Sequence, residues 1–293
     1  MILYPDEILT AKKLDGLLVS QSVKNELMVE LLRLSESNVY PCLATILIGN
    51  DPASISYINN KQKTAKSIGI KTLDYRLSEN TDQNDLSGLI NKLNKDKDVH
   101  GILIQLPLQK HLDKFDVLNL IDPNKDVDGL TFLNSGLLLN NKSKLIPCTP
   151  LGVMTLFDYY NIDLDGATVA IINRSNLVGK PLSSLLLERN STVITCHSRT
   201  KNLEELLQHS DIVITAVGNR DKFKLTKNMV KENSVIVDVG TSRVNGKLLG
   251  DVDFDDVKEK VSYITPVPGG VGPMTIAMLL KNTVQAAKII NSF

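Results

Sequence analysis

Lys61 is the residue of this sequence whose surroundings best suit proton-transfer chemistry. It lies on a predicted helix over residues 51–68, which opens with an N-cap acid and a proline at the first helical position, Asp51-Pro52. Spacings of three and four residues place Ser54, Tyr57 and Lys61 on one face of that helix. These three side chains can therefore share one site.

The same helix carries an apolar stripe that runs in line with Lys61. Ile58, Ala65 and Ile68 accompany the lysine at helical spacing. A lysine on a buried face loses hydration, which favours the neutral amine and makes it usable as an acid or base near neutrality. The alternative is a lysine that extends its amine to water along its aliphatic stem, and the helix alone favours that alternative.

Two polar residues elsewhere in the first half point to the same site. Gln105 interrupts an apolar run near the carboxyl end of a predicted parallel strand, where α/β proteins bind ligands. A glutamine there needs hydrogen-bond partners, and a lysine amine is a suitable one. Asp128 lies in a turn-rich loop just before Gly129, where an ordinary turn aspartate is the alternative. With no metal cluster, Ser/His/Asp order or nucleophile elbow in the chain, the sequence favours a lysine-centred acid/base site.

A second candidate site lies in a strand–turn–helix–strand segment over residues 168–200. Its turn is not GxGxxG, but Asn173 tolerates the left-handed conformation of a sharp turn and Gly179 permits close packing. The helix N-terminus then offers free N–H groups to a pyrophosphate. An ordinary strand-to-helix turn without a ligand is the alternative.

The end of the following strand indicates NADP as the cofactor. A site for NAD usually has an acid there to bind the ribose hydroxyls, and none occurs in the segment 196–200. Arg174 and Arg199 could instead bind a 2′-phosphate, with Ser198 donating a hydrogen bond. Each arginine taken alone would be a solvated surface charge. His197 is interpreted as structural.

The elements that must position these residues alternate between strands and helices, which predicts an α/β fold with parallel sheets. The first half has predicted strands over 41–49, 71–77 and 99–108, with helices over 51–68 and 81–95. The second half has predicted strands over 168–173, 192–197, 211–217 and 234–240, a hairpin over 243–250 and a final helix over about 273–290. The Val/Ile-rich strands of the second half indicate a Rossmann-like, doubly wound sheet covered on both faces.

The polar, then proline-punctuated stretch 141–152 marks the predicted domain boundary. We expect a catalytic domain over residues 1–148, joined by a C-terminal helix over 273–293. A cofactor-binding domain is expected over residues 149–272.

Composition narrows the class of protein further. The 293 residues are 42% hydrophobic and 23% charged, as in a globular protein. The 33 basic and 33 acidic residues cancel, so no global field favours nucleic acid or an anionic membrane as a partner. No apolar stretch approaches the ~20 residues that span a bilayer, and residues 1–16 lack the order of a signal peptide. Cys42, Cys148 and Cys196 have no disulfide or zinc spacing, which predicts reduced thiols, no metal and a cytoplasmic location.

Taken together, these segments resemble the bifunctional methylenetetrahydrofolate dehydrogenase/cyclohydrolase family. The resemblance runs through nearly the whole chain in order, in the motifs GNDPASISYINNKQKTAKSIGI, GILIQLPL, DPNKDVDG, PCTPLG, RSNLVGKP, TVITCHSRT, VDVG and TPVPGGVGPMT. It implies oxidation of 5,10-methylenetetrahydrofolate by NADP⁺, hydrolysis of the methenyl product to 10-formyltetrahydrofolate, a homodimer, and a final helix packed on the first domain.

The resemblance also implies roles for individual residues. Lys61 matches the catalytic lysine, Tyr57 the ring that stacks on the aminobenzoyl group, Gln105 the partner of the lysine, and Asp128 the aspartate that orients the pterin. The folate-side wall matches the motif from Pro268 to Thr275, including Pro268, Gly269, Gly270, Val271 and Thr275. The cofactor-contacting positions match the turn Asn173, Arg174 and Ser175 together with Ser198, Arg199 and Thr241.

Two departures from the family pattern and three alternatives accompany this interpretation. Asn173 replaces the glycine that opens the family's cofactor turn, and the segment 130–136 lacks a His-Pro pair. A monofunctional dehydrogenase would lack Lys61 or would not use it in catalysis. A non-catalytic nucleotide-binding protein would not need the set Tyr57, Lys61, Gln105 and Asp128. A shikimate-dehydrogenase-like enzyme would not need the PGGVGPMT loop.

Overall fold

The computed structural model describes residues 11–293, which form two compact units. The first unit comprises Ser20–Leu151 and Thr275–Phe293, and the second comprises residues up to Val19 together with Gly152–Met274. Three helices belong partly to each unit: α1 (Gly16–Glu36), α6 (Cys148–Tyr159) and α10 (Val271–Ile290). Residues 1–10, most of the segment examined for a signal peptide, lie outside the described residues.

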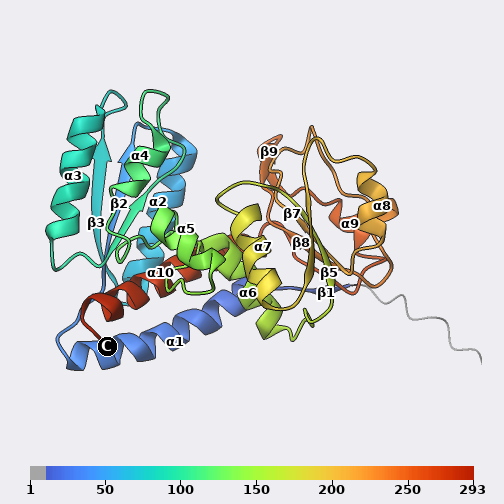
Figure 1. Ribbon diagram of the computed structural model, residues 1–293, viewed down its shortest axis with the longest axis horizontal. Coiled ribbons are helices and arrows are strands. Elements are labelled where there is room, and N and C mark those ends of the chain that lie inside the picture. The colour runs from blue at the N-terminus through green and yellow to red at the C-terminus, as the bar shows by residue number, and fades with distance from the viewer. Residues whose placement is uncertain (1–10) are drawn as a thin grey trace, which may run out of the picture. The chain divides into compact units, whose positions relative to one another are not determined.

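The first unit is built on a three-stranded parallel sheet with the order β3-β2-β4. Its strands are β2 (Cys42–Ile48), β3 (Lys71–Leu77) and β4 (Gly101–Ile104). The helices α2 (Pro52–Ser67) and α3 (Gln83–Lys95) connect them. The two crossovers run in opposite directions along the sheet, so right-handed connections put α2 and α3 on opposite faces. Figure 1 shows α3 lying along β3.

Apolar side chains of α3 form the core under one face of this sheet. Leu86, Ile90 and Leu93 recur at helical spacing and pack in one cluster with the strand residues Ile46 and Ile104. Two shorter helices complete the unit, α4 (Lys114–Asn119) and α5 (Phe132–Leu139). The three parallel strands therefore end at one edge, where the loops after β2 and β4 emerge.

The second unit contains a six-stranded parallel sheet with the order β1-β11-β8-β7-β5-β6. Its strands are β1 (Lys12–Lys13), β5 (Thr168–Ile172), β6 (Thr192–Cys196), β7 (Ile212–Thr215), β8 (Val235–Asp238) and β11 (Tyr263–Ile264). The remaining elements are α7 (Gly179–Glu188), α8 (Leu203–Gln208), the 3₁₀ helix η1 (Lys227–Met229), α9 (Phe254–Val257) and the hairpin of β9 (Ser242–Val244) and β10 (Lys247–Leu249). This is the doubly wound α/β architecture predicted from the sequence.

Three details differ from the sequence-based expectations. β1 pairs with β11, so residues 12–13 belong to the sheet of the second unit, whereas the sequence assigned residues 1–148 to one domain. A two-residue strand of lysines has no apolar pattern that could have revealed it. β4 ends at Ile104 rather than at residue 108, and Gln105 begins the loop. β6 is an edge strand, so Thr192 and Thr195 are exposed although both faces were expected to be covered.

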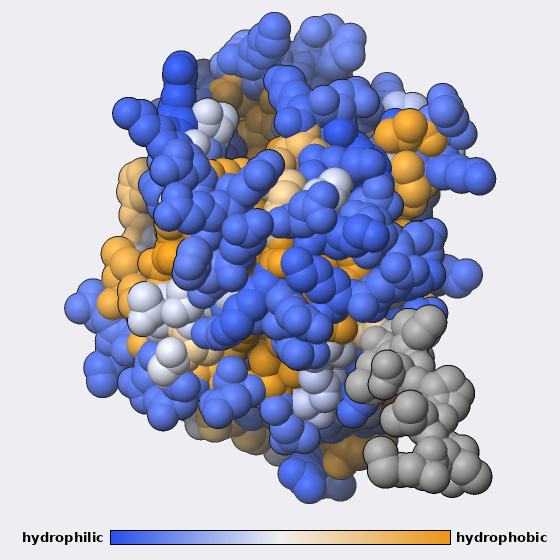
Figure 2. All heavy atoms as spheres, turned by 90° about the vertical axis from the view of Figure 1, so that its right-hand side faces the viewer, coloured by the Kyte–Doolittle hydropathy of each residue, from blue (hydrophilic) through white to orange (hydrophobic). Residues whose placement is uncertain are grey.

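The face of the described residues that Figure 2 shows is mainly polar. Hydrophilic residues cover most of the face in Figure 2, which is the side of Figure 1 where α8 and α9 lie. Within residues 11–293, no helix combines the length and apolar character that a membrane crossing requires.

Candidate active site

The start of α2 fixes the helix that carries Lys61. Asp51 is its N-cap, and the Asp51 carboxylate accepts a hydrogen bond of 2.8 Å from the Ser54 backbone N–H. Pro52 occupies the first helical position, as the sequence predicted. The helix start is therefore set by a local cap, independently of tertiary packing.

The buried stripe of α2 does not pass through Lys61, which corrects the sequence-based interpretation. The buried residues are Ser54, Ile58, Gln62 and Ala65. Gln62 occupies the position that the lysine was expected to share, because its amide donates a 2.8 Å hydrogen bond to the Thr45 hydroxyl inside the unit. Lys61 lies next to this stripe and is half-buried.

Lys61 is held by Gln105, as the sequence predicted. The Lys61 Nζ donates to the Gln105 Oε1 at 3.1 Å. Gln105 directly follows β4, and its own Nε2 donates to the Leu106 carbonyl at 2.8 Å. Since the amide nitrogen is engaged, the amide oxygen faces the lysine. One turn before Lys61, the Tyr57 side chain is 49% exposed, which leaves its ring available for stacking.

The loop that carries Asp128 is fixed by the two charged residues before it. Lys125 is buried, and its Nζ donates to the carbonyls of Leu93, Asn94 and Asp96 at 3.0, 2.8 and 2.6 Å. Burial lowers the pKa of this lysine. Asp126 is also buried and accepts hydrogen bonds of 2.8 Å from the Thr131 N–H and 2.9 Å from the Asn134 amide. Both charges therefore hold the loop in place through hydrogen bonds within the protein.

Asp128 interacts electrostatically with Lys61. Desolvation of the carboxyl raises the pKa of Asp128, while the Lys61 charge and the neighbouring Cys148 thiol, whose Sγ also lies 3.3 Å from the Val127 carbonyl oxygen, oppose that rise. The Cys148 thiol is buried, and burial raises its pKa well above the ordinary value, so it remains a protonated donor. The structure thus brings Lys61, Gln105 and Asp128 into one electrostatic environment within the first unit.

Three residues of this environment were missed by the sequence analysis. Cys148 contacts Asp128, and Asn282 of α10 donates to the Val127 and Ile146 carbonyls at 2.8 and 2.7 Å. Thr149 lies 3.0 Å from Thr275 between their hydroxyl oxygens. The stretch PCTPLG was interpreted as a boundary because of its prolines, and nothing local to it indicates a partner on the last helix.

The other residues of the predicted folate-side wall belong to the second unit. Gly269 has a φ of +107°, and its carbonyl accepts from the Leu17 N–H at 3.1 Å. A Cβ on Gly270 would lie 2.6 Å from the Pro266 carbonyl oxygen, and Val271 is buried at the start of α10. Pro268 completes this turn. Thr275 alone among the five predicted wall residues lies in the first unit.

Asn173 shapes the turn between β5 and α7 with its side chain. Its Oδ1 accepts from the N–H groups of Ser175 and Gly179 at 2.8 and 3.0 Å, and its Nδ2 donates to the Ala216 carbonyl at 2.6 Å. Asn173 is absent from the residues with positive φ, so the expected left-handed conformation is wrong. The close packing expected at Gly179 is present, because a Cβ there would lie 2.2 Å from the Asn173 carbonyl oxygen.

The N-terminus of α7 differs from the expected phosphate cradle. The Gly179 N–H is taken by Asn173, and the Lys180 N–H donates to the Ser175 carbonyl at 3.1 Å. Val178 N–H donates to the Ser175 hydroxyl at 3.2 Å. These N–H groups are therefore satisfied within the protein, which contradicts the expectation that they are free for a pyrophosphate.

The predicted cofactor side chains emerge at the carboxyl ends of neighbouring strands. Ile172 of β5 is paired with Cys196 of β6, so Arg174 and Ser198 each lie two residues beyond a matched pair. Arg174, Ser198 and Arg199 are exposed. His197 shapes the second of these loops, since its ring accepts from the Arg199 N–H at 3.1 Å.

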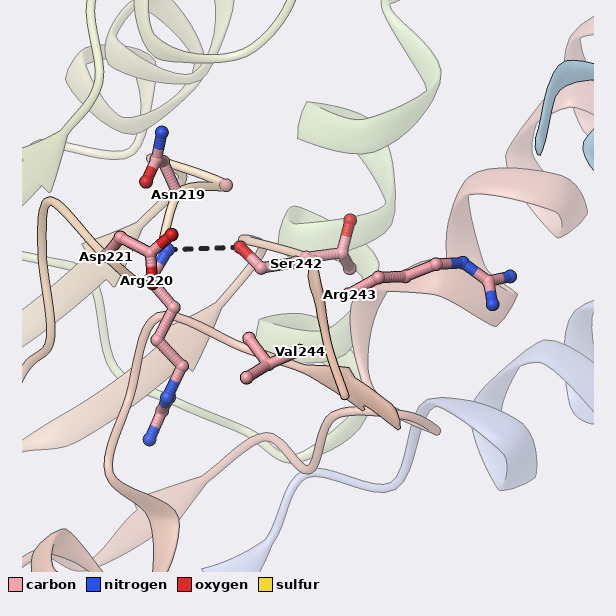
Figure 3. A pocket seen from close by; sticks show the side chains of 8 residues that line it. Asn219, Arg220, Asp221, Ser242, Arg243 and Val244 are labelled. Atoms are coloured by element: carbon pink, nitrogen blue, oxygen red, sulfur yellow. Dashed lines mark hydrogen bonds between the residues drawn. The ribbon is translucent and has the colours of Figure 1, made fainter. Parts of the chain in front are cut away.

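A pocket of about 310 Å³ lies beyond the ends of β7 and β8, lined by Gly218, Asn219, Arg220, Asp221, Thr241, Ser242, Arg243 and Val244. Figure 3 shows Asn219 and Asp221 on one side and the loop of Ser242 and Arg243 on the other. Thr241 is the predicted cofactor residue that lines it. The remaining lining residues were missed, although their place after two parallel strands could have indicated them.

Comparisons with known proteins match the chain to two domain models. Residues 14–128 match the catalytic-domain model of the tetrahydrofolate dehydrogenase/cyclohydrolases, and residues 147–291 match the NAD(P)-binding-domain model of the same enzymes. A bifunctional protein FolD of Nitrosopumilus maritimus is 54% identical over 281 residues, covering 96% of this chain and 98% of that protein.

Two solved structures have closely similar folds. The methylenetetrahydrofolate dehydrogenase/cyclohydrolase of Campylobacter jejuni is 47% identical, with a TM-score of 0.93, covering 97% of this chain and 100% of that chain. The dehydrogenase-cyclohydrolase of Trypanosoma brucei, solved with NADP and an inhibitor, is 34% identical, with a TM-score of 0.90, covering 96% of this chain and 98% of that chain.

Proposed function

The chain belongs to the tetrahydrofolate dehydrogenase/cyclohydrolase family, and from this premise we infer that it is a bifunctional enzyme of one-carbon metabolism. It oxidises 5,10-methylenetetrahydrofolate to the 5,10-methenyl cation and hydrolyses that cation to 10-formyltetrahydrofolate. NADP⁺ accepts the hydride in the first reaction. The two matched domains cover nearly the whole chain, so both activities have their structural basis here.

We propose that Lys61 transfers the proton in the hydrolysis, and the hydrogen bond between Lys61 Nζ and Gln105 Oε1 is the observation that carries this proposal. The oxygen of a water molecule bonds to the methenyl carbon, and the Lys61 amine, acting in its unprotonated form, takes the proton that the water loses. The ring carbon–nitrogen bond then breaks, the released nitrogen takes the second proton as the carbonyl forms, and Lys61 returns its proton to solvent. Gln105 orients the amine for the first transfer.

We propose that Asp128 and Tyr57 bind the folate. The Asp128 carboxyl lies next to the positive charge of Lys61 and is braced by the Cys148 thiol, so it can accept hydrogen bonds from the amino groups of a pterin. The half-exposed ring of Tyr57 offers a face for an aminobenzoyl group. These roles assign recognition to Asp128 and Tyr57 and proton transfer to Lys61. The motif from Pro268 to Val271, with Thr275, is proposed as the remaining folate wall.

The second unit fits an NADP phosphate through its side chains. Exposed guanidinium groups of Arg174 and Arg199 are suited to a 2′-phosphate, and the Ser198 hydroxyl can donate to it. The close approach of Gly179 to Asn173 leaves no room for a Cβ, which keeps the turn compact next to these groups. Ser175 and Thr241 are proposed as further cofactor contacts. Because the α7 N–H groups are already engaged, we expect the arginines to supply most of the anion binding.

The cyclohydrolase rate of Lys61→Met protein tests the proposed mechanism. Methionine keeps the bulk of the stem and removes the amine, so folding and NADP⁺ binding should be retained. We expect hydrolysis to fall by ~10²–10⁴, the usual effect of a positioned acid or base. Dehydrogenase activity should fall less. Lys63→Met, an exposed lysine on the same helix, is the matched control and should behave as the wild type. A Lys61→Met hydrolysis rate close to that of the control contradicts the mechanism.

We also propose a homodimer in the cytoplasm. Among the described strands, β3 pairs with β2 alone, and Leu73 on this open edge is 38% exposed. Cys42, Cys148 and Cys196 are all buried free thiols, which suits a reducing compartment. Sedimentation velocity at micromolar concentration tests the assembly, and a monomeric mass would refute it.

A further inference from the structure

Two buried carboxylates that have no role in the proposed chemistry lie behind the pocket of the second unit. Asp251 is 0% exposed and Asp238 is 3% exposed. The Asp251 carboxylate accepts hydrogen bonds from the Val217 N–H at 2.7 Å and from the Gly218 N–H at 3.0 Å. Those N–H groups belong to the loop after β7, and Gly218 lines the pocket. Asp251 therefore holds the backbone of the pocket wall from the side opposite to a ligand.

Asp238 holds Asp251 in return. The Asp238 carboxylate accepts from the N–H groups of Asp251 at 3.0 Å and Val252 at 2.9 Å. The two side chains also pack against each other's glycines: a Cβ on Gly240 would lie 2.0 Å from the Asp251 carboxylate, and one on Gly250 would lie 1.9 Å from that of Asp238. A side chain at either glycine would therefore collide with the neighbouring carboxylate.

Arg220 joins the pocket loop to the same segment. Its guanidinium donates to the carbonyls of Gly250 and Val252, on both sides of Asp251, and its positive charge favours the Asp251 carboxylate. Its backbone N–H donates to the Ser242 hydroxyl at 3.1 Å (Figure 3). In Figure 3 the Arg220 guanidinium points away from Asn219. The pocket loop is thus held both by hydrogen bonds to its backbone and by those of the Arg220 side chain.

We propose that Asp251 is a positioning residue for NADP⁺ binding, because it fixes the loop 217–221 in the shape that lines the cofactor pocket. The inference rests on the proposed function, which assigns this pocket to NADP⁺ through Thr241. A carboxylate suits the task because both of its oxygens accept, so it can receive two consecutive backbone N–H groups. An asparagine in its place must turn an NH₂ group toward one of them.

Asp251→Asn in the full-length protein tests the proposal, with Asp253→Asn as the matched control. Asp253 makes a surface ion pair with Lys224 and does not line the pocket. For Asp251→Asn we expect the Kd for NADP⁺, measured by calorimetry, to rise at least about tenfold. The KM for NADP⁺ should rise with it, while the cyclohydrolase rate should stay within about twofold of wild type.

These readouts separate positioning from a general loss of structure. A purely structural role would lower the melting temperature and both activities together, with the NADP⁺ affinity of the folded fraction unchanged. Affinity within about twofold of that of Asp253→Asn would overturn the proposal. A wild type that does not bind NADP⁺ would instead refute the proposed function.

Gly240→Ala gives a second route to the same test, and it decides the matter if Asp251→Asn does not fold. The added methyl displaces the Asp251 carboxylate without changing its chemistry. We expect the same selective loss of NADP⁺ affinity, at least about tenfold, with cyclohydrolase activity retained. An unchanged NADP⁺ affinity in this variant contradicts the positioning role of Asp251.

Discussion

The loop that carries Asp128 and the loop that lines the cofactor pocket are both held by buried charges, but only the first loop is held by a cation, Lys125, beside a carboxylate, Asp126. Lys125 donates to three carbonyls at the end of α3, whereas Asp238 and Asp251 accept from backbone N–H groups beyond parallel strands. The last carbonyls of a helix lack partners within the helix, and its dipole favours a cation there. The loops after strands present N–H groups, which a carboxylate satisfies. In each unit the backbone group that needs a partner determines the sign of the charge.

The two arrangements also differ in how they respond to protons. The single charge of Lys125 meets only neutral dipoles in direct contact. Asp238 and Asp251 are two like charges in one buried region, and burial together with Asp251 raises the pKa of Asp238 to about 6. The second unit is therefore expected to respond to pH near 6 through Asp238.

The largest expected effect is on the first of these arrangements. Lys125→Met removes the donor for three buried carbonyls while keeping the apolar stem. Hydrogen bonds to charged groups contribute ~1.5–3 kcal/mol each and are not additive, so we expect a loss of about 3–5 kcal/mol in the free energy of unfolding. Urea denaturation measures it, and Lys97→Met, an exposed lysine in the next turn of chain, is the control. A loss below about 1 kcal/mol would mean that water replaces the amine.

The second prediction concerns the pH dependence of stability. The pKa of Asp238 is about 6 in the folded protein, against ~3.9 for an unfolded aspartate. The folded state therefore binds the proton more tightly, so this group contributes most stability below about pH 4 and loses that contribution as the pH rises through about 6. Two pKa units correspond to about 3 kcal/mol.

Asp238→Asn has no carboxyl that titrates at this position, so the variant is the reference for the wild type. We expect the free energy of unfolding of the wild type to fall by about 3 kcal/mol relative to the variant between about pH 4 and 7. Parallel curves for the two proteins, from denaturation at several pH values, would show that the Asp238 carboxyl does not titrate in this range. The two loops would then not differ in this response to pH.

The sequence was sufficient for most of the elements and for the pairing of Lys61 with Gln105. Strand and helix periodicity predicted the strands β2, β3, β5, β7 and β8 and the helices α2 and α3, because each has a local pattern typical of its type. Lys61 and Gln105 were paired correctly, since a polar residue at the carboxyl end of a parallel strand has few other roles.

What the sequence could not predict depends on contacts between distant segments. Gln62 rather than Lys61 fills the buried position of α2, because Thr45 of β2 offers it a partner. The Asn173 side chain accepts from the Gly179 N–H at the start of α7, which no local pattern distinguishes from a left-handed turn. Lys125, Asp238 and Asp251 look like ordinary loop charges until the backbone groups around them are known. Residues that support a loop through distant backbone groups are therefore harder to predict than elements with a local pattern.

The smallest expected effect on stability comes from the exposed residue Arg174, which takes no part in the buried arrangements. Its side chain is exposed, so Arg174→Ala should leave the free energy of unfolding nearly unchanged. It should weaken NADP⁺ binding roughly tenfold and NAD⁺ binding far less, because only NADP⁺ carries the 2′-phosphate. Arg189→Ala is the control, because it removes an exposed guanidinium that pairs with Asp158 just beyond the other end of α7.

Added salt should reduce the difference in affinity between NADP⁺ and NAD⁺ in the wild type, since an exposed ion pair is screened within about 10 Å at 0.1 M. Equal weakening of both cofactors in Arg174→Ala, or a wild type that prefers NAD⁺, would show that the surface arginines do not set the cofactor choice.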